Sequence, residues 1–263
     1  MGRKTNQLKM KTNESLLIEY AKTYNIKEFI ETDPIQFPHH YQDKKDIEIS
    51  AFISSWLAYG NRKAILKTLG DIHKEFDNTD YLSPFNYIKE RGFERYRGDE
   101  KSLYRFYKNK DFYNLCQTLF TIYIEEKNQS LEDKIEKQIK KENQSDNPCL
   151  DVINAIILIF KEVEGIPINN TSACKRLCML LRWLVRNDNI VDLGIWTIIE
   201  PKDLIIPVDT HVHRQALRLG LTFSKQANMK TAIEITNNIK TIFPLDPGLA
   251  DFSLFGYGVN NPK

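Results

Sequence analysis

The sequence predicts an all-α protein with a core of its own, and three observations support this. Apolar residues recur at helical spacing along most of the chain, as at Phe112, Leu115 and Leu119, which places them on one face of a helix. Signals for strands are nearly absent, because the chain has no Asn-Gly pair and prolines bound the short β-branched stretches near Ile198 and Ile205. Hydrophobic residues make up 41% of the 263 positions, which is enough to bury a substantial core.

Helices are expected wherever this periodicity continues between turn residues. In chain order they cover residues 14–24, 47–59, 61–76, 111–127, 131–141, 150–163, 172–186, 210–219 and 228–243. Ser130 and Asp133 form a capping box ahead of the mixed-charge fifth helix. The polar segment 143–149 is the expected boundary between two lobes, because its residues favour turns and Pro148 can start the next helix.

Charge, cysteine use and hydropathy limit the expected location of the protein and the partners it can bind. The net charge of +2 gives no global signature of nucleic-acid binding, so any such surface must be local. The four cysteines are too scattered for a disulfide framework, which favours a reducing cytoplasm. The basic N-terminus precedes no apolar segment, and the longest apolar run, residues 152–160, is too short to cross a bilayer. We therefore expect a cytoplasmic monomer without a membrane partner.

The helices expected over 150–163 and 172–186 form a helical hairpin. Their connection, EGIPINNT, contains Gly165 and precedes Ser172. Such a hairpin can present backbone N–H groups and the positive end of its second helix to a phosphate, which makes Gly165 and Ser172 candidate DNA contacts. An ordinary turn between two helices is the alternative.

The second helix of this hairpin carries Lys175, Arg182 and Arg186 at positions i, i+7 and i+11, which lie on one side of a helical wheel. No acidic residue occurs between Ser172 and Asn187 to neutralise them. We expect Arg182 and Arg186 to contact DNA from an exposed basic stripe; a solvated helix face without a partner is the alternative.

Asp209 occupies the N-cap position of the helix expected over 210–219, with Pro207 before it and Gly220 as the stop. Its carboxylate can serve as a cap alone. It can also orient a nucleophile and stabilise a positive charge on a sugar, because the helix dipole favours the ionised form.

The segment PVDTHVHRQALRLGL resembles the motif V-D-T-H-V-x-R-x-x-x-R-L-G of the helix-hairpin-helix GPD superfamily of DNA glycosylases. The resemblance implies a fold of two interleaved helical lobes over residues 1–263, with the hairpin and catalytic segment at 150–220. It makes Asp209 catalytic, identifies Lys175 by context as the lysine nucleophile of bifunctional members, and leads us to expect DNA contacts at His211 and Arg214. The implied partner is double-stranded DNA that contains a damaged base.

Three further stretches extend this resemblance. EISAFISSWLAYGNRKAI resembles the helix and turn that place a polar wedge in DNA, which assigns DNA contacts to Asn61 and Arg62, although a simple helix break after Gly60 is the alternative. The long interval before Asp209 resembles the archaeal 8-oxoguanine glycosylases and implies an oxidised purine as substrate. ADFSLFGYGV resembles the last glycosylase helix, and because no four-cysteine cluster follows it, the resemblance implies no iron–sulfur cluster, other cofactor or metal.

These assignments predict a glycosylase with AP lyase activity. Lys175 attacks C1′ of the extruded nucleotide, Asp209 assists its deprotonation, and a Schiff base allows β-elimination. A catalytically inactive nucleic-acid-binding relative is one alternative. Another is a metal-dependent hydrolase that uses Asp209, His211 and His213, although the chain has no histidine after His213.

Overall fold

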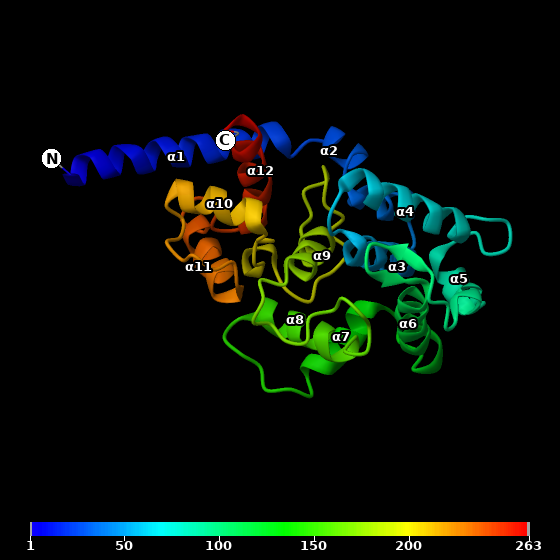
Figure 1. Cartoon of the computed structure of the whole chain (residues 1–263). Coiled ribbons are helices and arrows are strands. Elements are labelled where there is room, and N and C mark those ends of the chain that lie inside the picture. The colour runs from blue at the N-terminus through cyan, green and yellow to red at the C-terminus, as the bar shows by residue number, and fades with distance from the viewer. Residues whose placement is uncertain (1, 262–263) are drawn as a thin grey trace. The chain divides into compact units, whose positions relative to one another are not determined.

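The computed structural model describes the backbone of residues 2–261 and the side chains of residues 13–261. It is mostly helical, with one small two-stranded sheet in the described part (Figure 1), which confirms the predicted all-α class. The chain divides into two compact units: unit 1 contains residues 1–29 and 170–263, and unit 2 contains residues 30–169.

Unit 1 combines the first helix with the last third of the chain. Its helices are α1 (Gly2–Tyr24), α9 (Lys175–Val185), α10 (Thr210–Leu219), α11 (Met229–Ile239) and α12 (Ala250–Asn260). Helix α12 packs against both α1 and α10. The backbone of α12 approaches α1 closely, because a Cβ atom at Gly256 would clash with the ring of Tyr24, and the hydroxyl of Ser253 donates to the carbonyl of Leu17 at 2.7 Å. The two ends of the chain therefore share one core.

Unit 2 is built around α3 (Lys44–Leu57), whose residues from Ile47 onward are buried. The carboxylate of Glu48 within it accepts hydrogen bonds from the hydroxyl of Tyr123 and from the first backbone N–H groups of α7 (Leu131–Ile139), at Leu131 and Glu132. A buried carboxylate is stable there because it meets the positive end of a helix. The regular elements of unit 2 are α3 (Lys44–Leu57), α4 (Arg62–Phe76), α5 (Pro84–Lys89), β1 (Ser102–Tyr104), β2 (Tyr107–Lys108), α6 (Asn109–Phe120), α7 (Leu131–Ile139) and α8 (Pro148–Ile159), while α2 (Glu28–Glu31) crosses the boundary between the units.

All nine expected helices are present, with shifts at their ends. The expected helix over 111–127 is divided into α6 and a π-helical turn, Thr121–Glu125. One half of the predicted capping box is present, because the hydroxyl of Ser130 accepts from the N–H of Asp133 at 3.0 Å, whereas the carboxylate of Asp133 accepts from the N–H of Gln129 at 3.3 Å. Helix α9 begins at Lys175 rather than Ser172, because Cys174 has the left-handed φ of 45°.

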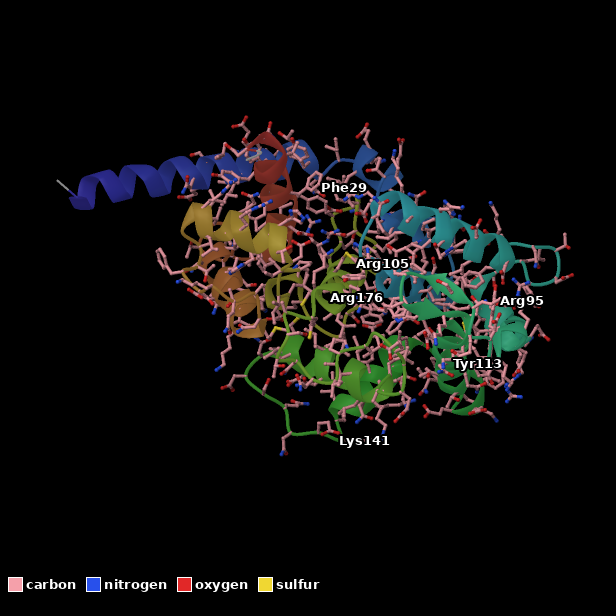
Figure 2. All side chains as sticks on the ribbon, in the orientation of Figure 1. Phe29, Arg95, Arg105, Tyr113, Lys141 and Arg176 are labelled. Atoms are coloured by element: carbon pink, nitrogen blue, oxygen red, sulfur yellow. The ribbon has the colours of Figure 1, made fainter. Side chains whose placement is uncertain are left out.

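The sequence did not predict the short antiparallel hairpin of β1 and β2 or the helix α5. Tyr104 pairs with Tyr107, so the hairpin turn consists of Arg105 and Phe106, and Arg105 is labelled in Figure 2. Asparagine or glycine usually supplies the positive φ that such a turn needs. Here Arg105 supplies it, with a φ of 57°, so the sequence carries no Asn-Gly signal for the hairpin.

The lobe boundary expected at 143–149 lies inside unit 2, where it spans the loop after α7 and the first two residues of α8. The chain passes between the units at 29–30 and at 169–170 instead. No helix in the described part of the chain is long and apolar enough to span a bilayer.

Candidate active site

Asp209 caps α10 as predicted. The residue before it, Val208, is buried, which holds the backbone of Asp209 in position. Its Oδ1 atom accepts from the N–H groups of His211 at 2.8 Å and Val212 at 2.9 Å. One carboxylate oxygen is therefore committed to the helix, which leaves Oδ2 available for chemistry.

Lys175 is the first residue of α9. The left-handed conformation of Cys174 turns the chain into the helix, and the carbonyl of Cys174 accepts from the N–H of Cys178 at 3.0 Å. The preceding strand-like segment is attached to α11 by a bridge between Ser172 and Asn228. Backbone contacts on both sides of Lys175 therefore fix the position of its own backbone.

The structure brings Lys175 and Asp209 together within unit 1. The Nζ atom of Lys175 lies 3.9 Å from Oδ2 of Asp209, and each side chain is 35% exposed. An amine and a carboxylate at this distance can exchange a proton after a small movement, and their partial exposure leaves the amine accessible to a substrate. This pair has the parts that nucleophilic catalysis by an amine requires.

His211 and Arg214 lie in the first turns of α10, beside the cap. A guanidinium nitrogen of Arg214 donates to Nδ1 of His211 at 3.1 Å; since guanidinium nitrogens only donate, Nδ1 is an acceptor and the proton of a neutral His211 ring is on Nε2. The Nε atom of Arg214 is buried without a hydrogen-bond partner in the described part of the chain. The two side chains therefore pair with each other beside the Asp209 cap.

The arrangement around His213 does not favour the metal-hydrolase alternative. His213 is buried, and its Nε2 lies 2.9 Å from the carbonyl oxygen of Ser224, whereas the exposed His211 contacts Arg214. Residues i and i+2 of a helix point in different directions. No group of three or more His, Cys, Asp or Glu residues that could hold a metal ion occurs among the described residues.

The prediction that Arg182 and Arg186 belong to an exposed basic stripe is wrong. Their side chains are only 4% and 3% exposed. Arg182 binds Asp192 at 3.2 Å and also pairs with Asp251. Both are buried because four carboxylates outside α9 neutralise them, so they are not available to DNA.

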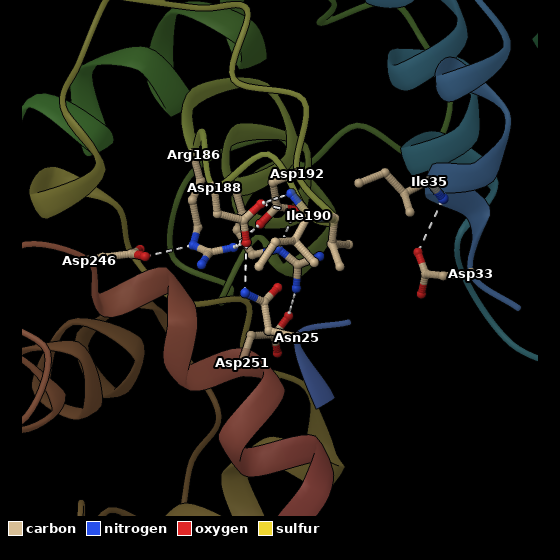
Figure 3. Close-up of polar contacts among 11 residues, drawn as sticks. Asn25, Asp33, Ile35, Arg186, Asp188, Ile190, Asp192, Asp246 and Asp251 are labelled. Carbon is tan, nitrogen blue, oxygen red and sulfur yellow. Dashed lines mark hydrogen bonds and ion pairs between the residues drawn. The ribbon is translucent and has the colours of Figure 1, made fainter. Parts of the chain in front are cut away.

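We refer to these two arginines and their four aspartates as the arginine network (Figure 3). Arg186 lies at its centre, 2.6 Å from Asp188, 2.7 Å from Asp192 and 2.8 Å from Asp246. The ring of Phe252 lies under both guanidinium groups, and its centroid is 4.6 Å from the Cζ atom of Arg182 and 5.5 Å from the Cζ atom of Arg186. The network connects α9 to the loop that follows it and to the start of α12.

Burial and charge act in opposite directions on the carboxylates of this network. Burial favours the neutral form of Asp188, but the Arg186 guanidinium and hydrogen bonds from Ile190, Asn25 and Val191 outweigh it and lower its pKa. Burial dominates at Asp192 and raises its pKa, even though Arg182 and Arg186 oppose that shift. No local sequence pattern predicts these contacts, because the carboxylates lie outside the helix that carries the arginines.

The remaining predicted DNA contacts have structural roles of their own. Asn61 caps α4 by accepting from the N–H of Ala64 at 3.1 Å, and the exposed Arg62 lies 3.8 Å from Asp33. Gly165 has a φ of 84°, and a Cβ atom there would clash with the hydroxyl of Tyr107. Gly165 belongs to unit 2 and Ser172 to unit 1, so the connection of the helical hairpin crosses the unit boundary.

Comparison with known proteins identifies one family. A family model described as a protein of unknown function, DUF2400, matches residues 33–260. No curated protein and no solved structure matches the chain. Because the family model covers most of the sequence, including Lys175 and Asp209, the chain belongs to the DUF2400 family.

Proposed function

We propose that this protein is a DNA glycosylase with AP lyase activity that removes a damaged base, with an oxidised purine such as 8-oxoguanine as the substrate class. The observation that carries the proposal is the pairing of Lys175 and Asp209 at 3.9 Å. The glycosylase-like motif and the start of a separate helix supply these two residues, and the fold brings them together. The construction of unit 1 from both ends of the chain also supports the two interleaved lobes of the proposed glycosylase fold.

The proposed reaction begins when the neutral amine of Lys175 attacks C1′ of the damaged nucleotide. The C1′–N bond breaks, the base departs with the bonding electrons and takes a proton, and Asp209 Oδ2 accepts a proton from the attacking nitrogen. The C1′–O4′ bond then breaks, O4′ takes up the proton held by Asp209, and an iminium forms between Lys175 and C1′. Asp209 Oδ2, again a carboxylate, accepts a proton from C2′, and the 3′ phosphate leaves with the electrons of the C3′–O bond, which completes strand cleavage.

Asp209 suits this reaction because its two oxygens have different partners. The helix N–H groups bind Oδ1 and restrict rotation of the carboxylate, while Oδ2 faces the amine. A carboxylate fixed in this way can accept a proton and stabilise positive charge on the sugar without reorganising.

The proposal is tested with duplexes that each contain one lesion, including 8-oxoguanine, uracil and an abasic site. Base release and strand cleavage are measured separately for the wild type and for Lys175→Gln. The matched control is Lys202→Gln, because Lys202 is an exposed lysine of the same unit, paired with Glu200. We expect cleavage that Lys202→Gln retains and Lys175→Gln loses; DNA binding without processing of any lesion would instead identify a binding protein.

A further inference from the structure

The turn of the β1–β2 hairpin forms an exposed aromatic and basic surface in unit 2. We define the hairpin surface as Tyr59, Lys63, Arg105 and Phe106. Tyr59 is 45% exposed and Phe106 is 55% exposed, and their ring centroids lie 5.6 Å apart. Lys63 is an exposed residue in the first turn of α4, close to Tyr59 in the chain, and α4 packs against β1. Two flat rings and two cations are thus presented by adjacent elements.

The basic residues of this surface differ from those at the base of the same hairpin. Lys108 and Lys110 both pair with Glu100, each at 2.5 Å. Arg105 has no carboxylate partner among residues 13–261, and its guanidinium lies over the ring of Tyr59, 4.8 Å from the centroid. The positive charge at the turn is therefore not neutralised by a carboxylate of the described chain, which suits an anionic ligand.

The hairpin surface rests on a rigid base. The hydroxyl of Tyr104 donates to the carbonyl of Tyr59 at 2.5 Å, which attaches the hairpin to the turn after α3. Tyr107 is fully buried against Trp56, with ring centroids 4.4 Å apart. Side chains held on such a base lose little further freedom when they bind a ligand.

The backbone at Arg105 has a φ of 57°, in the left-handed region that glycine occupies at lower cost. The turn therefore holds a long cationic side chain, with its guanidinium over an exposed ring, at a position that favours glycine.

We propose that the hairpin surface binds an unpaired nucleotide of DNA. The base stacks on Phe106 and Tyr59, while Arg105 and Lys63 bind the flanking phosphates. Aromatic side chains beside cations are the usual means of binding unstacked bases, and extrusion of a damaged nucleotide leaves its former partner unpaired. The inference rests on the proposed function for its choice of DNA as the ligand.

Binding of the full-length protein is measured by fluorescence anisotropy on two duplexes. One is fully paired, and the other places adenine opposite a stable abasic-site analogue. We expect Phe106→Leu to weaken binding to the second duplex about tenfold, the loss typical of one stacked base, with a much smaller effect on the first. Phe223→Leu is the matched control, because Phe223 is an 85% exposed aromatic residue of unit 1, and it should bind both duplexes like the wild type.

Arg105→Gly separates folding from binding. Glycine accommodates a φ of 57°, so we expect a thermal midpoint at or above that of the wild type together with weaker binding to the abasic duplex. Normal binding by both Phe106→Leu and Arg105→Gly would overturn the inference, as would capture of a protein by this surface without any affinity for DNA.

The proposed function has a separate readout, Lys175-dependent cleavage. Cleavage with no effect of the hairpin variants on binding would refute only the inference. Loss of affinity in the hairpin variants, with no cleavage by the wild type, would refute only the glycosylase activity.

Discussion

The two roles of Asp209 can be separated experimentally, because asparagine is nearly as good an N-cap as aspartate. Asp209→Asn should retain the bonds to the N–H groups of His211 and Val212 but lose the negative charge that faces Lys175. We expect the rate of base excision to fall by about 10²- to 10⁴-fold. The free energy of unfolding, measured in urea, should change by less than about 1 kcal/mol. An Asp209→Asn variant as active as the wild type would show that the residue is only a cap.

The sequence identified both members of this pair but did not predict the distance between their side chains. The cap at Asp209 followed from local patterning, and its catalytic role followed from the motif. Lys175 was identified by context, and its place at the start of a helix depends on the left-handed Cys174, which no sequence signal indicated. The contact between the two side chains depends on how α9 and α10 pack within unit 1, which local patterns do not determine.

At the scale of the helix, α9 depends on the arginine network for stability. Arg186→Ala should lower the free energy of unfolding by about 3–5 kcal/mol, because Asp188, Asp192 and Asp246 then lose a cation at their shared, largely buried site. Lys202→Ala, which removes an exposed lysine paired with Glu200, should cost less than about 1 kcal/mol. Urea denaturation monitored by circular dichroism checks both values. Equal effects of the two substitutions would contradict the structural role of the network.

The same helix shows why periodicity alone misassigned Arg182 and Arg186. A helical wheel places them on one side of α9, and the absence of nearby acidic residues suggested an exposed stripe. Their partners come from the loop after α9 and from the α12 region, at Asp188, Asp192, Asp246 and Asp251. A wheel records the faces of one helix and contains no information about charges that other segments bring to it.

At the scale of the whole molecule, His73 should make stability depend on pH. His73 is buried in unit 2, with Nε2 2.7 Å from the hydroxyl of Ser50 and Nδ1 2.8 Å from the carbonyl of Leu69. Burial lowers its pKa from 6.5 to about 4, while the bond to Leu69 opposes that shift and the nearby His40 adds to it. The unfolded chain therefore binds a proton more readily than the folded one between these two pH values.

Stability from this residue should be present above pH 6.5 and fall as the pH drops to about 4, by about 3 kcal/mol. Urea denaturation at pH 7 and pH 4 measures the change, and His73→Gln removes the titrating group. We expect the variant to lose about 3 kcal/mol less than the wild type between these two pH values. An identical loss in both proteins would show that His73 does not titrate in this range.

The overall class was predictable, because amphipathic periods determine where helices form. The division of the chain into two units was not predictable, because the boundary between units depends on which segments pack together. The polar loop at 143–149 resembled a linker, yet unit 2 continues through it to residue 169, and residues 1–29 belong to the same unit as the C-terminal part.

The most direct test of the central claim is reduction of the enzyme–DNA intermediate with borohydride. A Schiff base between Lys175 and C1′ would be reduced to a stable covalent adduct, which peptide mapping by mass spectrometry can assign to one residue. We predict an adduct on Lys175 with a lesion-containing or abasic duplex, absent in Lys175→Gln and present in Lys202→Gln. An adduct on another lysine, or none with any duplex, would contradict the assignment of Lys175 as the nucleophile.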